Sequence, residues 1–159
     1  MKFRFTLVFL FLVNGSIAQE LNGDQILGNW LSDNQQTIIE FFREGDAYFG
    51  KMVWLEHPND ENGQPRKDVR NPDKSLRDQL LLGLVCIRDM VYSGNALYKN
   101  GQGYSPDFGK YLRGNLKLLD ENTLEVNVKI AFFTKTVVWK RISFDQSTGR
   151  VKRYSMERG

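Results

Sequence analysis

Side chains that could bind or transform a ligand concentrate between Asp68 and Gly83, in the stretch DVRNPDKSLRDQLLLG. Within it, carboxylate, amide and guanidinium groups could hold a polar molecule: Asp68, Asn71, Asp73 and Arg77. Arg77 could bind a carboxylate or phosphate through two parallel hydrogen bonds. An ion pair with Asp73, four residues earlier, would instead give Arg77 a structural role.

Acidic residues are frequent in and around the same stretch: Glu56, Asp60, Glu61, Asp68, Asp73 and Asp78. Two carboxylates about 5 to 10 Å apart across a cleft could hydrolyse a glycosidic bond, so a carboxylate-dependent hydrolase is one hypothesis. The same acids would also serve as helix caps or face solvent. We assign no catalytic residue from this pattern, and an enzyme is the less favoured class of function.

Several other chemistries are excluded by composition. His57 is the only histidine, which rules out a catalytic triad and a multi-histidine metal site. Cys86 is the only cysteine and lies in the apolar segment LVCIRDMV, so it predicts a buried thiol and no internal disulfide. The NDENG segment at 59–63 lacks the acid spacing of a calcium loop, and no nucleotide fingerprint is present. We expect no metal and no cofactor.

The elements that would position these residues are short strands. Apolar and polar residues alternate from Thr123 to Phe132, which is typical of a strand with one buried face. Turn-forming residues recur at short intervals, and they delimit strands at 28–31, 37–43, 47–55, 84–92, 96–99, 110–119, 123–132, 136–144 and 151–156. Such a chain can remove its sheet edges by closing. We predict an all-β fold, a single antiparallel up-and-down β-barrel of about eight or nine strands.

The polar stretch predicts a long loop and a short helix after the third strand. Asn71 suits the N-cap, Pro72 suits the first helical position, and Gly83 is placed to end the segment. We expect the loop to lie across one opening of the barrel. Trp54, Tyr104 and Lys110 belong to strands that could end beside it, and they complete the predicted ligand-binding set.

The chain begins with Lys2 and Arg4, an apolar run from 5 to 13, and small residues up to Ala18. This pattern predicts a signal peptide over 1–18 and a single domain over 19–159, exported to the periplasm or outside the cell. The apolar run is shorter than the roughly 20 residues that cross a bilayer, so no transmembrane segment is expected after cleavage.

Net charge argues against a nucleic-acid partner. The formal charge is +3, and Lys2 and Arg4 of the leader supply two of these charges. Basic residues are nevertheless enriched from Lys129 to Gly159. That end could contact an anionic surface, or its lysines and arginines could simply face solvent.

Several longer patterns point to a known family. FGKMVWL (49–55), the D-x-x-NPD-x-x-LR pattern from Asp68, LLGL (81–84) and PDFGKYLRG (106–114) occur in order. From Gly28 to about Ile142 the chain resembles the exported bacterial family called domain of unknown function 2147. It departs at Ser105, where the family usually has aspartate, and at 127–129, where the family has a glycine-containing stretch.

The resemblance implies a calycin-like, lipocalin-like barrel with no established activity. Gly28-Asn29-Trp30 is also similar to the G-x-W that opens lipocalin barrels, where a basic residue from a late strand covers the tryptophan. Lys140 or Arg141, beside Trp139, could stack there. The positions expected to be structural are therefore Gly28, Trp30, Pro72, Gly83, Trp139 and Arg141.

Three functional hypotheses stay open. The first is a protein that binds a small hydrophobic or amphipathic molecule, such as an envelope lipid, inside the barrel. The second is a barrel filled by its own side chains that contacts an envelope protein through the 56–83 loop. The third is the carboxylate-dependent hydrolase.

Overall fold

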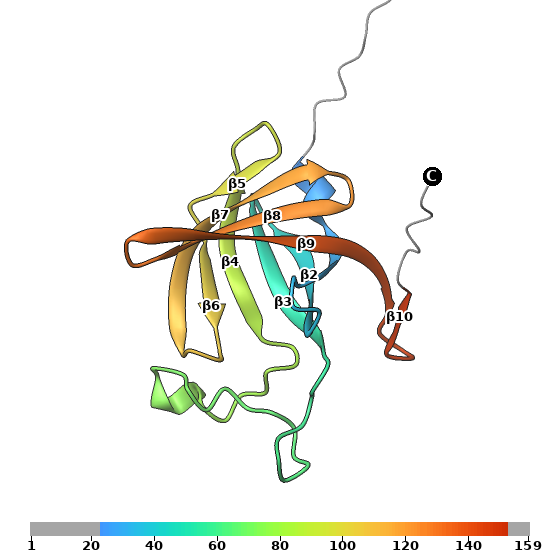
Figure 1. The fold of residues 1–159 in the computed structure, drawn as a ribbon, viewed down its shortest axis with the longest axis vertical. Helices are drawn as coiled ribbons and strands as arrows, with labels where there is room; N and C mark the ends of the chain where they lie inside the picture. The colour runs from blue at the N-terminus through green and yellow to red at the C-terminus, as the bar shows by residue number, and fades with distance from the viewer. Residues whose placement is uncertain (1–22, 153–159) are drawn as a thin grey trace, which may run out of the picture.

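The computed structural model describes residues 23–152, which form an antiparallel β-barrel with two short 3-10 helices (Figure 1). The elements are η1 (Gly23–Ile26), β1 (Gly28–Leu31), β2 (Thr37–Glu44), β3 (Ala47–Leu55), η2 (Lys74–Leu76), β4 (Val85–Tyr92), β5 (Leu97–Lys99), β6 (Gln102–Ser105), β7 (Lys110–Asp120), β8 (Thr123–Ile130), β9 (Phe133–Asp145) and β10 (Arg150–Lys152).

Neighbouring strands pair in chain order, and β1 pairs with β9 to close the barrel. Strands β5 and β6 each pair with both β4 and β7, so together they occupy one place in a closed circuit of eight strands. Strand β10 pairs only with β9 and lies outside the circuit. The predicted all-β barrel is confirmed.

Most predicted strand positions are also observed, with differences at β6, β8 and β9. Strand β8 ends at Ile130, two residues before its predicted end. Strand β6 was not predicted, because its four residues contain Gly103 and show no apolar alternation. Strand β9 begins at Phe133, three residues before the predicted start, because the tight β8–β9 turn leaves only two residues unpaired. The predicted signal peptide, at 1–18, lies outside the described residues.

The predicted short helix is a three-residue 3-10 helix, η2, and its N-cap is Asp73 rather than Asn71. The Asp73 carboxylate accepts hydrogen bonds from the Ser75 amide at 2.9 Å and the Ser75 hydroxyl at 2.7 Å. Asn71 instead accepts a bond from the Asp73 amide at 2.9 Å, which forms a tight turn just before the helix. The capping prediction was therefore two residues early.

One end of the barrel is closed by η1 and a buried tryptophan. The Trp30 indole is fully buried and donates to the Ile26 carbonyl at 2.8 Å, and the Tyr98 hydroxyl donates to the Gly23 carbonyl at 2.6 Å. The Arg141 guanidinium lies 4.2 Å from the centre of the Trp30 ring, so Arg141 is the basic residue expected over it.

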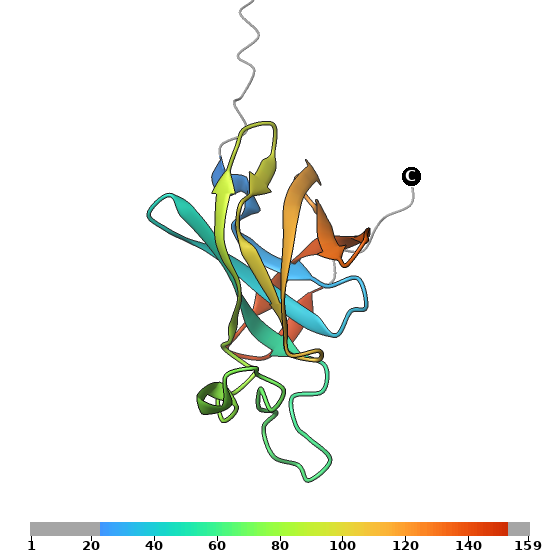
Figure 2. The same ribbon diagram turned by 90° about the vertical axis from the view of Figure 1, so that its left-hand side faces the viewer.

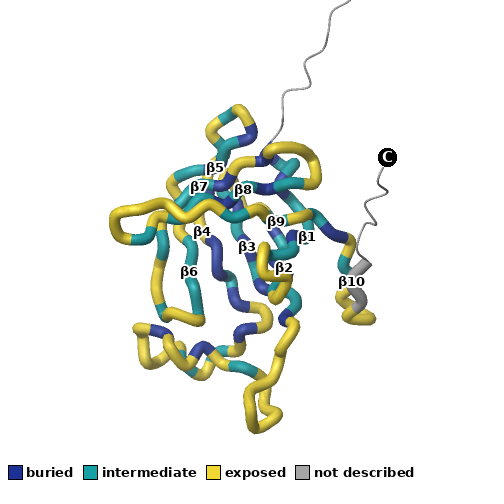
Figure 3. The backbone as a smooth tube through the Cα atoms, viewed as in Figure 1, coloured by how far each residue is buried: buried dark blue, intermediate teal, exposed yellow. Residues whose placement is uncertain are grey.

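The opposite end carries four connections, including the longest one in the barrel. They are the β1–β2 turn (32–36), the β3–β4 loop (56–84), the β6–β7 turn (106–109) and the β8–β9 turn (131–132). Two perpendicular views place the 56–84 loop beyond the barrel end, away from η1 (Figures 1 and 2). Buried residues occur along the strands from one end of the barrel to the other, whereas the loop is largely exposed (Figure 3).

Candidate functional site

An internal cavity of about 450 Å³ lies between the barrel walls. Its walls are largely apolar, and six strands contribute to them: Ile39, Met52, Ile87, Leu112, Val128 and Val137. The strand register explains this lining, because residues paired directly across two strands lie on the same face of the sheet. Ile39 pairs with Met52 and Val126 pairs with Val137, so each pair brings two apolar side chains to the inner face.

Lysine side chains appear where the cavity reaches the open end. Lys135 pairs with Val128, a wall residue, and Lys110 pairs with Ser105; all four residues line the cavity. Both lysines are exposed, and within residues 23–152 neither forms an ion pair. Asp107, also in the lining, is already paired with Arg66 at 3.2 Å. The cavity is therefore apolar in its depth, with unpaired amines near its entrance.

A buried polar cluster joins the long loop to the cavity wall. Asp68 and Asn71 are each only 1% exposed. The Asp68 carboxylate accepts hydrogen bonds from the Tyr104 hydroxyl at 2.7 Å, the Asn71 amide at 2.7 Å and the Gln79 amide at 3.3 Å. Tyr104 itself lines the cavity. Three donors satisfy the buried carboxylate, which fixes the loop against the barrel.

Two cavity-lining groups are held in their neutral forms. Burial, followed by the hydrogen bond to Asp68, raises the pKa of the Tyr104 hydroxyl. Burial raises the pKa of the Cys86 thiol to about 12. The thiol is therefore protonated at neutral pH and contributes to the wall as a small apolar group, as predicted from its sequence context.

The structure brings only part of the predicted ligand-binding set together. Tyr104 and Lys110 line the cavity, and Asp68 and Asn71 lie behind Tyr104. Asp73 caps η2 and is exposed. Trp54, opposite Ile38 across β2 and β3, lines neither of the two cavities described here.

Arg77 has a different partner from the one expected. Its Nε donates to the Asn71 carbonyl at 2.8 Å, while Asp73 bonds to Ser75, so the predicted Asp73–Arg77 ion pair is not formed. Pro72 is exposed beside this turn. Gly83 has a φ of 90°, which favours glycine, and its amide donates to the Met52 carbonyl at 2.7 Å.

Lys135 and Val137 were missed as wall residues. The β9 segment TKTVVWKR is apolar at neighbouring positions, so its alternation does not say which residues face inward. Its pairing with β8 resolves the two faces, because the alternation of β8 is clear. Trp139, predicted to be structural, packs against the core and lines the cavity opposite Leu124.

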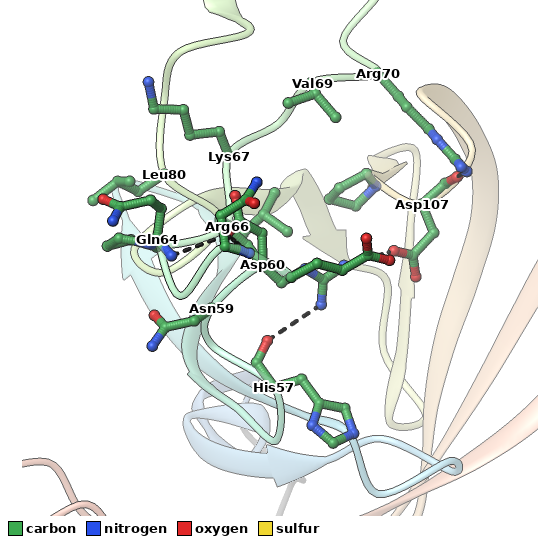
Figure 4. A pocket seen from close by; sticks show the side chains of 15 residues that line it. His57, Asn59, Asp60, Gln64, Arg66, Lys67, Val69, Arg70, Leu80 and Asp107 are labelled. Atoms are coloured by element: carbon green, nitrogen blue, oxygen red, sulfur yellow. Dashed lines mark hydrogen bonds and ion pairs between the residues drawn. The ribbon is translucent and has the colours of Figure 1, made fainter.

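A second, more open cavity of about 960 Å³ lies within the loop region (Figure 4). Its polar groups mostly bond to one another: Arg66 donates to the His57 carbonyl at 3.5 Å and pairs with Asp107, and Asp60 accepts from the Gln64 amide at 2.9 Å. Within the described part of the chain, no group of three or more His, Cys, Asp or Glu side chains could hold a metal ion.

These features define a class of protein. A closed eight-stranded barrel with a 3-10 helix, a tryptophan and a stacked arginine at one end and a cavity toward the other is a lipocalin-like fold. The chain is similar to a solved structure described as "Protein HP1028 from the human pathogen Helicobacter pylori belongs to the lipocalin family". The two share 24% identity with a TM-score of 0.64, over 82% of this chain and 92% of that one.

Residues 28–141 match the family described as "Uncharacterized protein conserved in bacteria (DUF2147)", and the chain belongs to that family. No curated protein matches it. Over residues 23–152 no helix is long and apolar enough to cross a membrane.

Proposed function

We propose that this protein binds a small amphipathic molecule whose apolar part occupies the barrel cavity. The observation that carries the proposal is the cavity of about 450 Å³ with a largely apolar wall. Sites for small molecules typically have volumes of about 300 to 1,000 Å³ and are lined mainly by apolar side chains. A barrel filled solid by its own side chains would leave no such space.

The polar end of the ligand would lie near Lys110 and Lys135. Both amines are exposed at the open end of the cavity and have no carboxylate partner among the described residues. A carboxylate or phosphate group would pair with them while its alkyl chain lies against Val128 and Val137. The ligand class is therefore an anionic amphiphile, such as a long-chain acid or an acyl phosphate ester.

A fluorescent long-chain acid provides the direct test. Val137→Trp, which places a large side chain in the cavity, is expected to weaken probe binding at least tenfold. Val138→Trp is the matched control. Val138 follows Val137 on β9, so its side chain points to the outer face of the barrel, where it is 39% exposed. Equal affinity of the two variants would place the ligand elsewhere and overturn the proposal.

The lysine contribution is tested with a pair of probes that share one alkyl chain. Lys110→Gln combined with Lys135→Gln is expected to weaken binding of the acid but not of the corresponding alcohol. Loss of the same size for both probes would mean that the lysines shape the entrance without recognising charge. Independently of these probes, mass spectrometry of the protein purified from its own cells would identify the natural ligand.

We also propose that the protein works in the cell envelope after export. The basic and apolar leader at 1–18 supports this, together with membership in a family of bacterial proteins. The exported protein is expected to begin at Gln19. Amino-terminal sequencing of the secreted or periplasmic fraction checks this, and an intact Met1 in that fraction would contradict it.

A second candidate function is contact with an envelope protein through the 56–84 loop. Exposed apolar side chains favour it, since Val69 is 64%, Leu80 47% and Leu82 50% exposed on a loop that the Asp68 cluster holds in place. The hydrolase hypothesis has less support. Asp60, Asp73 and Asp78 each bond to nearby loop residues, and none lines the barrel cavity.

A further inference from the structure

The β8–β9 hairpin presents two large apolar side chains to solvent at its tip. Phe132 is fully exposed, at 106%, and Phe133 is 60% exposed. The turn consists of Ala131 and Phe132, whereas two-residue hairpin turns usually carry asparagine, aspartate or glycine. The hairpin projects from the side of the barrel (Figure 1), and its tip is exposed (Figure 3). An exposed aromatic tip costs solubility without stabilising the barrel.

The same hairpin is surrounded by positive charge. No aspartate or glutamate occurs between Val126 and Phe144, whereas Lys129 and Lys135 flank the tip. Arg113 on β7 pairs directly with Lys129 on β8, so two cations lie opposite each other across the strands. Neither forms an ion pair within residues 23–152. Like charges in this arrangement destabilise a sheet, and a bound anion would relieve the repulsion.

We infer that the β8–β9 hairpin is a docking element for an anionic lipid bilayer. Phe132 and Phe133 would enter the interfacial region, where aromatic side chains are favoured, and Arg113 and Lys129 would contact lipid phosphates. Ile130 and Lys135 of the hairpin also line the cavity, so docking would bring the cavity entrance next to the bilayer. This inference does not depend on which ligand the cavity holds.

Vesicle co-sedimentation tests the inference with the protein purified after export. It is expected to bind phosphatidylcholine vesicles that contain phosphatidylglycerol, and to bind pure phosphatidylcholine vesicles much less. Phe132→Ser combined with Phe133→Ser should abolish most of this binding. Leu119→Ser is the matched control, because Leu119 is 50% exposed near the end of β7, next to the β7–β8 turn at the other end of the barrel.

A charge reversal separates docking from folding. Lys129→Glu would create an ion pair with Arg113, so it should raise the unfolding midpoint while it lowers vesicle affinity. Loss of one positive charge near an anionic surface weakens binding about fivefold, and reversal weakens it further. Lys99→Glu, on β5, makes the same change in net charge away from the hairpin and should leave vesicle affinity almost unchanged.

Insertion is read directly from a fluorophore. Phe132→Cys can be labelled selectively, because Cys86 is buried and its pKa is raised to about 12. The fluorescence emission of an environment-sensitive label there should shift to the blue with anionic vesicles, and the emission of a label at Leu119→Cys should not.

No vesicle binding, equal binding to neutral vesicles, or serine variants that bind like the original protein would each overturn the inference. Because Phe132 lies in the turn and does not line the cavity, the single variant Phe132→Ser should still bind the long-chain acid, which distinguishes failure of docking from failure of the proposed ligand site.

Discussion

The hydroxyl of Tyr104 donates a 2.7 Å hydrogen bond to the Asp68 carboxylate, and this bond joins strand β6 of the cavity wall to the long β3–β4 loop. Asp68 is buried, so its oxygens depend on protein donors instead of water. The position of the loop and the shape of the cavity wall are therefore coupled through one side-chain contact.

Removal of that contact should loosen the loop. Tyr104→Phe is expected to cost about 1 to 3 kcal/mol in the free energy of unfolding, because it leaves a buried carboxylate oxygen without a donor. Urea titration measures this, and limited proteolysis should show faster cleavage within 56–84. Tyr111→Phe is the control, since Tyr111 faces Tyr104 across β6 and β7 but is 48% exposed. Equal stability of the two variants would contradict the anchoring role.

Arg141 should be irreplaceable by lysine. Its guanidinium stacks on Trp30 and donates to the carbonyls of Glu121 and Leu27, both at 2.6 Å, and to that of Gln25. A lysine amine cannot reproduce this planar set of donors. Arg141→Lys should destabilise the barrel by about 2 to 4 kcal/mol, measured by urea unfolding. The neighbouring Lys140→Gln, on an exposed residue, should cost under about 0.5 kcal/mol.

The Cys86 thiol should react slowly while the protein is folded. Its pKa is raised from 9.0 to about 12, so the thiolate fraction at pH 8 is about a thousandfold lower than for an exposed cysteine. Alkylation by iodoacetamide should be slow in buffer, faster at higher pH, and rapid in urea. Fast alkylation of folded protein at pH 8 would contradict the burial of the thiol.

The same pKa shift predicts alkaline sensitivity. Because the folded pKa lies above the unfolded value, the neutral thiol's contribution to stability is complete below pH 9.0 and is lost as the pH rises toward about 12. The slope is at most about 1.4 kcal/mol per pH unit for this one group. Urea titrations between these pH values, compared with Cys86→Ala, should show a shallower pH dependence in the variant.

Gly114 should tolerate no side chain. A Cβ there would overlap the carbonyl oxygen of Asn127 on the paired strand β8, so Gly114→Ala must separate β7 from β8. A loss of about 2 kcal/mol or more in unfolding free energy is expected. Gly103→Ala is the control, because its nearest neighbour would be the Leu112 carbonyl at an ordinary 3.7 Å. Similar unfolding midpoints for the two variants would contradict the close approach of β7 and β8 at Gly114.

Local patterns were sufficient to predict most of the barrel. Strand β8 alternates without interruption, and turn residues mark the ends of most strands, so strand positions follow from short segments of sequence. The contact between Trp30 and a late basic residue was anticipated from resemblance, and the structure assigns it to Arg141. Strand β6 was not predicted, because it is short and contains Gly103.

The candidate site was harder to predict because it depends on pairing between distant segments. Asp68 looked like a solvent-facing ligand group, yet Tyr104, Asn71 and Gln79 enclose it. Arg77 and Asp73 have the spacing of a helical ion pair, but the 3-10 helix is too short to bring them together. Lys135 became a cavity residue only through its register with Val128.

The seam between β1 and β9 has a consequence for folding kinetics. Trp30 and Arg141 are register partners there, although almost the whole domain separates them along the chain. Bringing the two ends of so long a segment together costs conformational entropy before any favourable contact between them has formed. We therefore expect the seam to be the last part of the barrel to form. Until β9 has emerged from the ribosome, Arg141 cannot cover Trp30, so the incomplete chain exposes apolar surface that chaperones would bind.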